Sequence, residues 1–534
     1  MKIYVNILLL FCLFINTALA IDSPTLPQVY IDTTYSLPTG GTTHTCATAA
    51  EFSTALTNSA LGDVIVLTAG TTYAGPFVLP NKSTGSGWIY IISSALASLP
   101  ASGTRVAISD ASNMPKITVA TGGRSAIETA NNAHHFRFVG IEFKPVANNF
   151  VYSLIRIGNA DVSESTLPSN ITFDRCYIHG DSTVGGRRGV AMDGTSIAVV
   201  DSYVSDFKEV GADTQALWAY NTPGPLKIVN NYLEAAGENV MFGGNDPSIN
   251  NCVPSDIEIR RNHFFKPLSW VGSSWSVKNI LEFKNAQRVL VEGNTFENNW
   301  AASQNGFSIL ITPRNQDGDC EWCGVADITY RYNKLINGER GINILGRDYT
   351  YTSQVLARVN IHDNLFQVTV GAGLQYLGGP THISMNHNTF YTSGTIAVVE
   401  SSPKADYCDF INNIFIATSY GFIGSGTGEG TATLNTYFTN YTYAKNAMVG
   451  RNCVSYPADN YCPATVAAVG FVDYAGGNYR LASDSTYKNA GTDGADLGAN
   501  IDLIDAAMAY SNNYYSITPR LVRGVTVRSG ASIK

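Results

Sequence analysis

The chain has little charge for its length, because Asp, Glu, Lys and Arg make up only 14% of its 534 residues. This scarcity, together with 45% hydrophobic residues, excludes wholesale disorder and allows a large buried core. The net charge of -8 and the pI near 5.5 exclude a general attraction to nucleic acid or to acidic membranes. An anionic partner must therefore be met by a local group of basic side chains.

Long apolar runs are also scarce, and the one present lies at the N-terminus. Residues 1–20 combine Lys2, an apolar stretch and the small-residue pattern Ala18-Leu19-Ala20, which is typical of a secretory signal cut after Ala20. No later run is long enough to span a bilayer. We therefore expect a secreted or periplasmic protein without a membrane span, and a monomer. The glycosylation acceptors matter only in a eukaryotic secretory pathway; they are Asn81, Asn170 and Asn440.

Nine cysteines are present, and loss of Cys12 with the signal would leave an even number, which suits an oxidising compartment. Cys453 and Cys462 flank a short polar loop, while Cys320 and Cys323 form a Cys-x-x-Cys pair. No second Cys/His pair has the spacing of a zinc site, so we interpret these thiols as structural. The sequence does not determine how they pair.

A short motif recurs from residue 170 onward: β-forming residues, an Asn, one further residue and then an aromatic or aliphatic one. Clear copies include "IVNNYL", "VEGNTF" and "IHDNLF", and weaker ones are "FDRCYI" and "VVDSYV". Their spacing of 24 to 39 residues suits a solenoid with loops of variable length. The repeated asparagines are Asn231, Asn262, Asn294, Asn333, Asn364, Asn388 and Asn413.

A second strand-like run follows each copy, so each repeat carries about three short strands. The prediction is an all-β right-handed parallel β-helix whose corner asparagines form a hydrogen-bonded ladder. A β-sandwich with coincidental Asn turns is the alternative. We expect an N-terminal cap and first coils over residues 21–145, with an amphipathic helix near residues 47–60. Central coils would span 146–420. Final coils and an irregular C-terminal cap would span 421–534, with the Asn pattern fading after Ser419, residues 471–502 closing the end, and no prediction beyond about 505.

These features resemble the pectate-lyase-type β-helix superfamily over most of the chain. The segment "AAEFSTALTNSALGDVIVLTAGTTY" resembles the first turn of secreted polysaccharide lyases of the alginate lyase and chondroitinase type. The repeats are specific for the fold and much less so for an activity.

Charged residues occur on the strand-like run "NILEFKN". If Leu281 and Phe283 point into the coil, Glu282 and Lys284 point outward, and we expect them not to be buried. The same alternation places Arg314 and Arg347 outward on the next two coils. A basic group of this kind suits a polyanion such as a uronate glycan. Neighbouring arginines would lower the pKa of Lys284 toward working pH.

The resemblance implies β-elimination, with Lys284 as base, Arg314 assisting and Arg347 binding substrate carboxylate. Glu282 and Trp300 are further candidates for substrate binding. The resemblance also implies calcium, for which Glu238, Asn239 and Glu282 are candidate ligands. The chain departs from the family here, because the residues at the acidic ligand positions before Lys284 are Val277 and Asn279. We expect loops 265–279 and 314–327 to wall the groove.

Two other function classes stay open. The same face could serve a non-catalytic glycan-binding or adhesion protein. A β-helix glycoside hydrolase would need a close pair of outward carboxylates, and the sequence pattern shows none. Absorbance of an unsaturated product separates a lyase from both.

Overall fold

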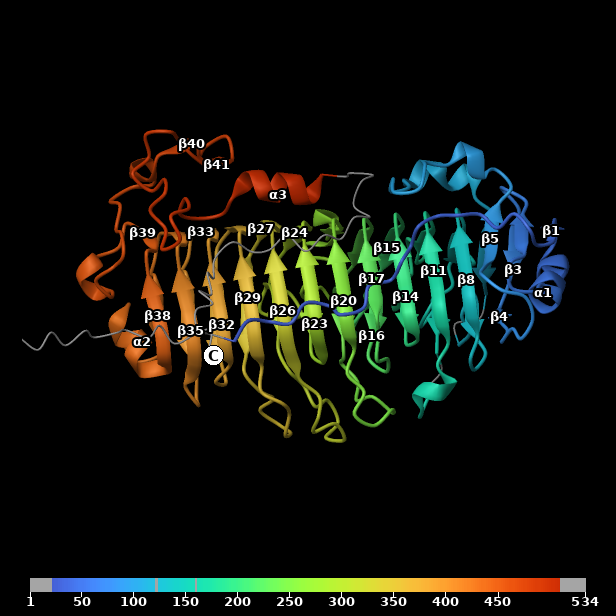
Figure 1. Ribbon diagram of the computed structural model, residues 1–534, viewed down its shortest axis with the longest axis horizontal. Coiled ribbons are helices and arrows are strands. Elements are labelled where there is room, and N and C mark those ends of the chain that lie inside the picture. The colour runs from blue at the N-terminus through green and yellow to red at the C-terminus, as the bar shows by residue number, and fades with distance from the viewer. Residues whose placement is uncertain (1–21, 121–122, 159–160, 510–534) are drawn as a thin grey trace, which may run out of the picture.

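A computed structural model describes residues 22–120, 123–158 and 161–509. The chain winds into a stack of coils with three long parallel sheets along its sides, which confirms the predicted parallel β-helix. Figure 1 shows the stack from the N-terminal coils on the right to the C-terminal coils on the left. The predicted signal of residues 1–20 lies outside the described residues.

Each coil contributes one strand to each sheet, and neighbouring strands of the stack are parallel. The 14-stranded sheet consists of β1 (Thr43–Cys46), β2 (Val64–Leu67), β5 (Ile89–Ser93), β8 (His134–Val139), β11 (Ser169–Asp174), β14 (Thr195–Val200), β17 (Leu226–Val229), β20 (Ser255–Arg260), β23 (Ala286–Glu292), β26 (Val325–Arg331), β29 (Ala357–His362), β32 (Thr381–Asn386), β35 (Ala405–Ile411) and β38 (Phe438–Ala444). The 12-stranded sheet consists of β4 (Phe77–Leu79), β7 (Ile127–Thr129), β10 (Ile155–Ile157), β13 (Arg188–Met192), β16 (Gln215–Ala219), β19 (Glu238–Phe242), β22 (Leu281–Phe283), β25 (Phe307–Ile311), β28 (Arg340–Leu345), β31 (Leu374–Leu377), β34 (Ala397–Glu400) and β37 (Phe422–Gly424). The 13-stranded sheet consists of β3 (Thr72–Ala74), β6 (Lys116–Val119), β9 (Glu142–Pro145), β12 (Tyr177–His179), β15 (Tyr203–Phe207), β18 (Tyr232–Ala235), β21 (His263–Phe265), β24 (Thr295–Asn299), β27 (Lys334–Gly338), β30 (Leu365–Val368), β33 (Thr389–Thr392), β36 (Ile414–Ala417) and β39 (Ala447–Val449).

The hydrophobic core lies inside the coils. There, side chains of one type stack on side chains of the same type in the next coil. Phe264 and Phe296 stack with ring centroids 4.6 Å apart, and Phe366 and Phe390 stack at 4.2 Å. Such in-register stacking follows from a period of two along each strand, which sends alternate side chains inward on every coil. The inward direction of Leu281 therefore fixes the outward direction of its neighbour.

The asparagine ladder runs along the corner between the 14-stranded and 13-stranded sheets. Each Oδ1 accepts the backbone N–H of the ladder residue one coil earlier, as Asn294 does from Asn262 at 2.9 Å. The ladder continues through Asn446 and Asn460, so the expectation that the pattern fades after Ser419 is wrong. Asn446 follows Asn413 by 33 residues, within the range of the earlier repeats, so this copy could have been found in the sequence.

The turn before each ladder asparagine needs a left-handed backbone. The preceding residue has positive φ in successive coils, for example Asn230 at 59° and Asp363 at 53°, and glycine occupies this place at Gly293. This conformation turns the chain sharply between two sheets and aims the asparagine inward. Each corner therefore consists of a residue with positive φ and the ladder asparagine, and this explains why the motif places Asn just before the next strand.

The ends of the stack are covered by different structures. Helix α1 (Ala49–Asn58) begins with a capping box between Thr48 and Glu51 and buries Phe52 against the first coils, as predicted. Helix α2 (Thr431–Tyr437) contacts the last strands at the other end. Residues 471–502, expected to close that end, instead fold back along the outer face of the 13-stranded sheet. This segment carries β40 (Phe471–Asp473), β41 (Asn478–Leu481) and α3 (Ile501–Met508).

Residues 25–33, expected to belong to the N-terminal cap and first coils, run along the outer face of the 14-stranded sheet. Their backbone bonds to the side chains of Asp327, Asp256, Lys227 and Arg137, which come from coils far apart in the stack.

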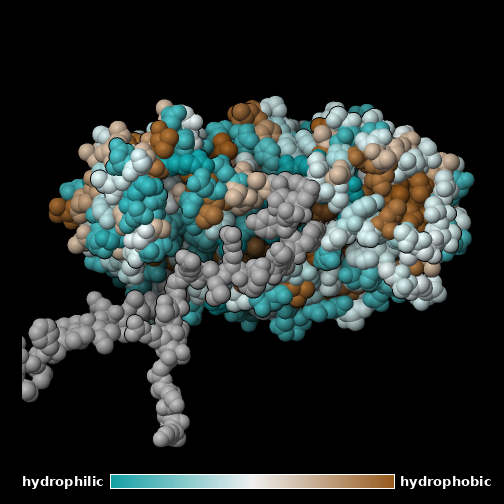
Figure 2. Space-filling model, turned by 45° about the horizontal axis from the view of Figure 1, so that its top comes forward, coloured by the Kyte–Doolittle hydropathy of each residue, from teal (hydrophilic) through white to brown (hydrophobic). Residues whose placement is uncertain are grey.

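None of the helices among the described residues could cross a membrane. Figure 2 shows mostly hydrophilic or intermediate surface, with the broadest apolar patch toward the N-terminal end.

Candidate functional site

The outer face of the 12-stranded sheet carries Glu282 between two side chains that point into the coil. Leu281 and Phe283 are buried in the core. Glu282 shares the outer face with Met241 of β19 and Leu310 of β25, with which it is in register. The predicted direction of Glu282 is confirmed. Its predicted exposure is wrong, because the residue is only 2% exposed. Neighbouring side chains and loops cover it, which alternation along one strand does not reveal.

Two neighbours hold the carboxylate of Glu282. Asn279 donates its Nδ2 to Oε2 at 2.9 Å, and the Nζ of Lys284 lies 3.7 Å from Oε1. The same Nδ2 of Asn279 lies 3.1 Å from Oε1 of Gln304, in the loop after β24. The buried carboxylate of Glu282 therefore fixes the position of the Lys284 ammonium, which lies nearer the surface.

A second buried carboxylate, Glu238, lies one coil earlier. Arg188 donates to Oε1 of Gln215 at 3.0 Å, and Gln215 donates to Oε2 of Glu238 at 2.7 Å. Lys278 lies 4.0 Å from Oε1 of Glu238 and forms a close ion pair with Asp213. Burial, followed by repulsion from Glu282, raises the pKa of Glu238 to about 7.

The pKa of Lys284 departs from the expectation drawn from its arginine neighbours. Attraction to Glu282 raises it, and this effect exceeds burial and the repulsion from Arg314, which both lower it. The expected lowering is therefore wrong. The buried carboxylates raise the pKa of Lys284 more than its arginine neighbour lowers it. The sequence does not show that these carboxylates surround the lysine.

Arg314 and Arg347 follow Lys284 on the next two coils. The backbone N–H of Arg314 donates to the carbonyl of Lys284 at 2.9 Å, so the two residues are direct neighbours across coils. The guanidinium of Arg314 lies 3.8 Å from Asp348, which also accepts the N–H of Asn315. Arg347 donates its Nε to the carbonyl of Gly378 at 3.2 Å. The three cations therefore belong to consecutive coils and lie just after the C-terminal ends of β22, β25 and β28, near the middle of the 12-stranded sheet.

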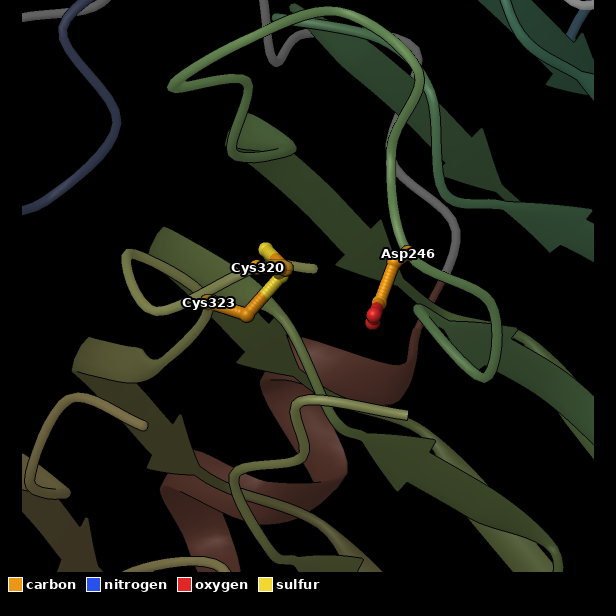
Figure 3. A group of neighbouring side chains, drawn as sticks. All are labelled: Asp246, Cys320 and Cys323. Carbon is orange, nitrogen blue, oxygen red and sulfur yellow. A yellow bond between two sulfur atoms is a disulfide. The ribbon is translucent and has the colours of Figure 1, made fainter. Parts of the chain in front are cut away.

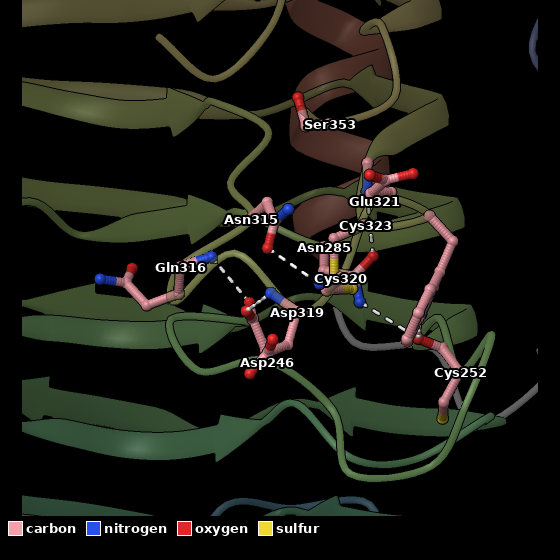
Figure 4. Close-up of a disulfide and its surroundings, with 12 residues drawn as sticks. Asp246, Cys252, Asn285, Asn315, Gln316, Asp319, Cys320, Glu321, Cys323 and Ser353 are labelled. Carbon is pink, nitrogen blue, oxygen red and sulfur yellow. Dashed lines mark hydrogen bonds between the residues drawn. A yellow bond between two sulfur atoms is a disulfide. The ribbon is translucent and has the colours of Figure 1, made fainter. Parts of the chain in front are cut away.

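The loop after Arg314 is held by a carboxylate and a disulfide. Asp246 accepts the N–H groups of Gln316, Asp317 and Asp319. Cys320 is bonded to Cys323, and Figure 3 shows this disulfide beside Asp246. Among the described residues these two cysteines and Asp246 are the one close cluster of potential His, Cys, Asp or Glu metal ligands. Because both sulfurs are in the disulfide and the carboxylate is taken up by amides, the cluster is structural. Figure 4 shows how it fixes this loop beside Asn315.

A second disulfide joins Cys453 and Cys462. The structural interpretation of both cysteine pairs is therefore confirmed. The other cysteines of the described chain have free, buried thiols; they are Cys46, Cys176, Cys252 and Cys408.

Aromatic side chains border the site on its N-terminal side. The guanidinium of Arg188 lies 4.0 Å from the ring centroid of Trp218, and Trp218 stacks on Tyr220 with centroids 4.6 Å apart. Trp300, predicted to bind substrate, packs with Trp275 against the cluster of Trp270 and Val277. This tryptophan cluster belongs to the predicted wall formed by loop 265–279.

Sequence reasoning missed several residues of this cluster. Arg188 and Gln215 occupy places that match that of Glu238, a predicted metal ligand: each lies two residues before a core residue of its strand, so their register could have been found by aligning those strands. Asp213 and Lys278 lie in loops of unequal length. No local pattern indicates that they meet.

The residues fit a calcium ion poorly. Glu238 Oε1 and Asn279 Oδ1 are buried without a hydrogen-bond donor, which suits a hard cation. Asn239, also a predicted ligand, donates its Nδ2 to the carbonyls of Leu233 and Phe265 at the corner with the 13-stranded sheet, and its Oδ1 is likewise buried without a donor. Lys278 and Lys284 already stand beside the carboxylates. A divalent ion about 4 Å from one ammonium would be repelled by about 8 kcal/mol at an effective dielectric constant near 20.

No family model and no curated protein sequence matches this chain. The structure of the PL6 family alginate lyase AlyGC matches with a TM-score of 0.54 and 11% identity, over 89% of this chain and 59% of that one. The chain thus spans about 59% of the length of that lyase. A mannuronic acid specific family 6 lyase from human gut microbiota matches at 13% identity over 79% and 83% of the two chains, with a TM-score of 0.44. Pectate lyase Pel9A matches at 13% identity over 84% and 90%, with a TM-score of 0.29. The match to the AlyGC structure therefore shows a shared parallel β-helix fold.

Proposed function

We propose that the protein is a secreted polysaccharide lyase that cleaves an acidic, uronate-containing glycan by β-elimination. The observation that carries this proposal is the pairing of Lys284 and Arg314 on adjacent coils, with side chains 14% and 33% exposed above buried carboxylates. Two disulfides and the predicted signal support an exported protein.

The chemistry needs one base, one acid and neutralisation of the uronate carboxylate. Neutral Lys284 removes the proton from the carbon next to that carboxylate, and the electrons of this C–H bond form a C=C bond. The C–O bond to the departing sugar breaks, and its oxygen takes up the proton that the Lys284 ammonium now carries, which regenerates the neutral amine. Arg314 assists this transfer and Arg347 binds the carboxylate, because a fixed guanidinium stabilises developing negative charge.

The buried carboxylates set the conditions for Lys284. Glu282 positions the ammonium and raises its pKa, so the neutral amine becomes abundant only at alkaline pH. The proposed enzyme therefore works best above neutral pH. Binding of a substrate carboxylate would have to compete with Glu282 for the same ammonium.

A glycoside hydrolase is less well supported, although the structure does bring two carboxylates together. Glu238 and Glu282 interact electrostatically across neighbouring strands. A hydrolase needs both groups to reach the sugar. Their exposures are 0% and 2%, and lysines cover them, so neither reaches a bound glycan.

In this proposal Arg314 and Arg347 neutralise the uronate carboxylate, and no step of the reaction is assigned to a metal. Calcium at Glu238, Asn239 and Glu282 stays a prediction, which requires Lys278 to turn away from Glu238.

The test is incubation with pectate, alginate and glycosaminoglycans while the absorbance of the unsaturated product is followed. The proposal expects absorbance on at least one of them and its loss in the double variant E282Q/K284M. Lys404→Ala, at an exposed turn, is the matched control and should retain activity. Reducing ends without absorbance would indicate a hydrolase. Binding without any cleavage would indicate an adhesion protein.

A further inference from the structure

One outward file of residues runs along the whole 12-stranded sheet. Each member is in register with the next, so together they trace the floor of the outer face. In chain order the file is Val78, Glu128, Arg156, Ala191, Trp218, Met241, Glu282, Leu310, Asn343, Gln375, Val398 and Ile423. A glycan aligned with the stack would contact these residues in this order.

Charge is distributed unevenly along this file. Glu128 and Arg156 lie on the N-terminal side, and Glu282 lies in the middle. From Leu310 to Ile423 the file carries no charge over four steps of about 4.8 Å, or about 19 Å. In the adjacent outward file Leu345 and Leu377 are followed by Glu400, an acid. Arg314 and Arg347 follow the strands of Leu310 and Asn343, so the part of this face that offers little to attract an anion lies beyond them, from Gln375 to Ile423.

This uncharged strip, Leu310 to Ile423, is open to a ligand. Its members are all half-buried, and a cavity of about 320 Å³ lies over Gln375, Val398 and Ile423. Asn343 donates to Oε1 of Gln375 at 2.9 Å, and its own Oδ1 is buried without a donor. An apolar floor beside the amide of Gln375 suits the C–H face and hydroxyl groups of a neutral sugar.

We propose that the strip binds uncharged sugar residues on one side of the uronate that is cleaved. The substrate is then a mixed glycan, in which acidic and neutral sugars occur in one chain, and not a polymer of uronates alone. A sugar carboxylate bound over Val398 or Ile423 would lose its hydrating water without gaining a cation as partner. It would also be repelled by the negative charge of Glu400. This inference rests on the proposed lyase function, since it assigns the cleaved uronate to Lys284.

The test compares cleavage of a uronate homopolymer with cleavage of a polymer in which uronates alternate with neutral hexoses. The wild type should show a KM about tenfold lower on the mixed polymer, which corresponds to one well-made contact. Val398→Lys and Ile423→Lys should narrow or reverse this preference with kcat nearly unchanged. Val472→Lys, on exposed β40, should leave it as it is. An equal or opposite preference in the wild type, or no response to either lysine, would overturn the proposal.

A separate measurement distinguishes failure of the strip from failure of the lyase. If neither polymer is cleaved, binding of a reduced neutral oligosaccharide is measured by calorimetry. Loss of that binding in both lysine variants, with unchanged thermal unfolding, would support the strip and reject only the lyase reaction. Equal binding by wild type and variants, or none by any, would reject the strip as well.

Discussion

The Nζ of Lys284 lies 3.7 Å from Oε1 of Glu282, two residues earlier on the same face of the same coil. The carboxylate is buried and the ammonium is partly exposed. This pair gives the proposed base a fixed position and a pKa above its ordinary value.

Replacement of Glu282 by Gln should shift the activity profile toward lower pH. The substitution removes the largest influence that raises the Lys284 pKa, so the neutral amine forms at lower pH. Gln retains an oxygen for Asn279. The measurement is kcat/KM against pH. An unmoved or upward-shifted rising limb would show that Lys284 is not the base.

Removal of Lys284 alone should inactivate the protein and also weaken the fold. Lys284→Ala leaves the buried charge of Glu282 without its ammonium, at a cost of about 3 kcal/mol. The double variant E282Q/K284M removes both charges and should unfold near the wild-type midpoint, with activity at least about 100-fold lower. Substantial cleavage by this well-folded variant would reject the assigned base.

Loss of one ladder asparagine should be costly. Asn294 is buried, accepts from Asn262 and donates to the carbonyl of Ile259, so Asn294→Ala strands these partners at a cost of about 3 kcal/mol. The expected result is a clearly lower midpoint of urea unfolding. Asn58→Ala, at the exposed end of α1, is the control and should change little. Equal midpoints for the two variants would contradict a stabilising ladder.

Asp193 should make stability depend on pH. Burial raises its pKa to about 6, so the folded state disfavours the ionised form, and the stability due to this group falls as pH rises from about 4 to about 6. The loss amounts to about 3 kcal/mol. Its Oδ1 accepts from Tyr220 and Asn221, and Asn can supply the same oxygen. Asp193→Asn should therefore be more stable than wild type at pH 7.5 but not at pH 4. Urea unfolding at both values checks this, and identical pH slopes would refute it.

Calcium should stabilise a lysine variant and leave the wild type unaffected. In Lys278→Met the oxygens of Glu238 and Asp213 lose their ammonium, so a divalent cation can approach them. We expect a calcium-dependent rise in the melting temperature of this variant only, and no effect of a chelator on wild-type activity. A wild type that binds calcium by calorimetry would restore the metal to the proposed mechanism.

The sequence could predict the fold because its determinants are local. The Asn motif specifies a corner on every coil, and alternation around Leu281 and Phe283 specifies which side chains point inward. The same alternation predicted that Glu282 points outward and that Lys284, Arg314 and Arg347 follow on consecutive coils. It did not predict that Glu282 is covered, since burial depends on side chains from other coils and loops.

By itself the sequence determined a solenoid with a capping helix and a basic group on successive turns. Only the tertiary structure decided that Glu238, Asp213 and Lys278 join Glu282, that the pKa of Lys284 is raised, and that an uncharged strip extends from Leu310 to Ile423. The physical reason is that strand period is a local property, whereas burial and charge at one point sum contributions from coils that loops of unequal length place far apart in the chain.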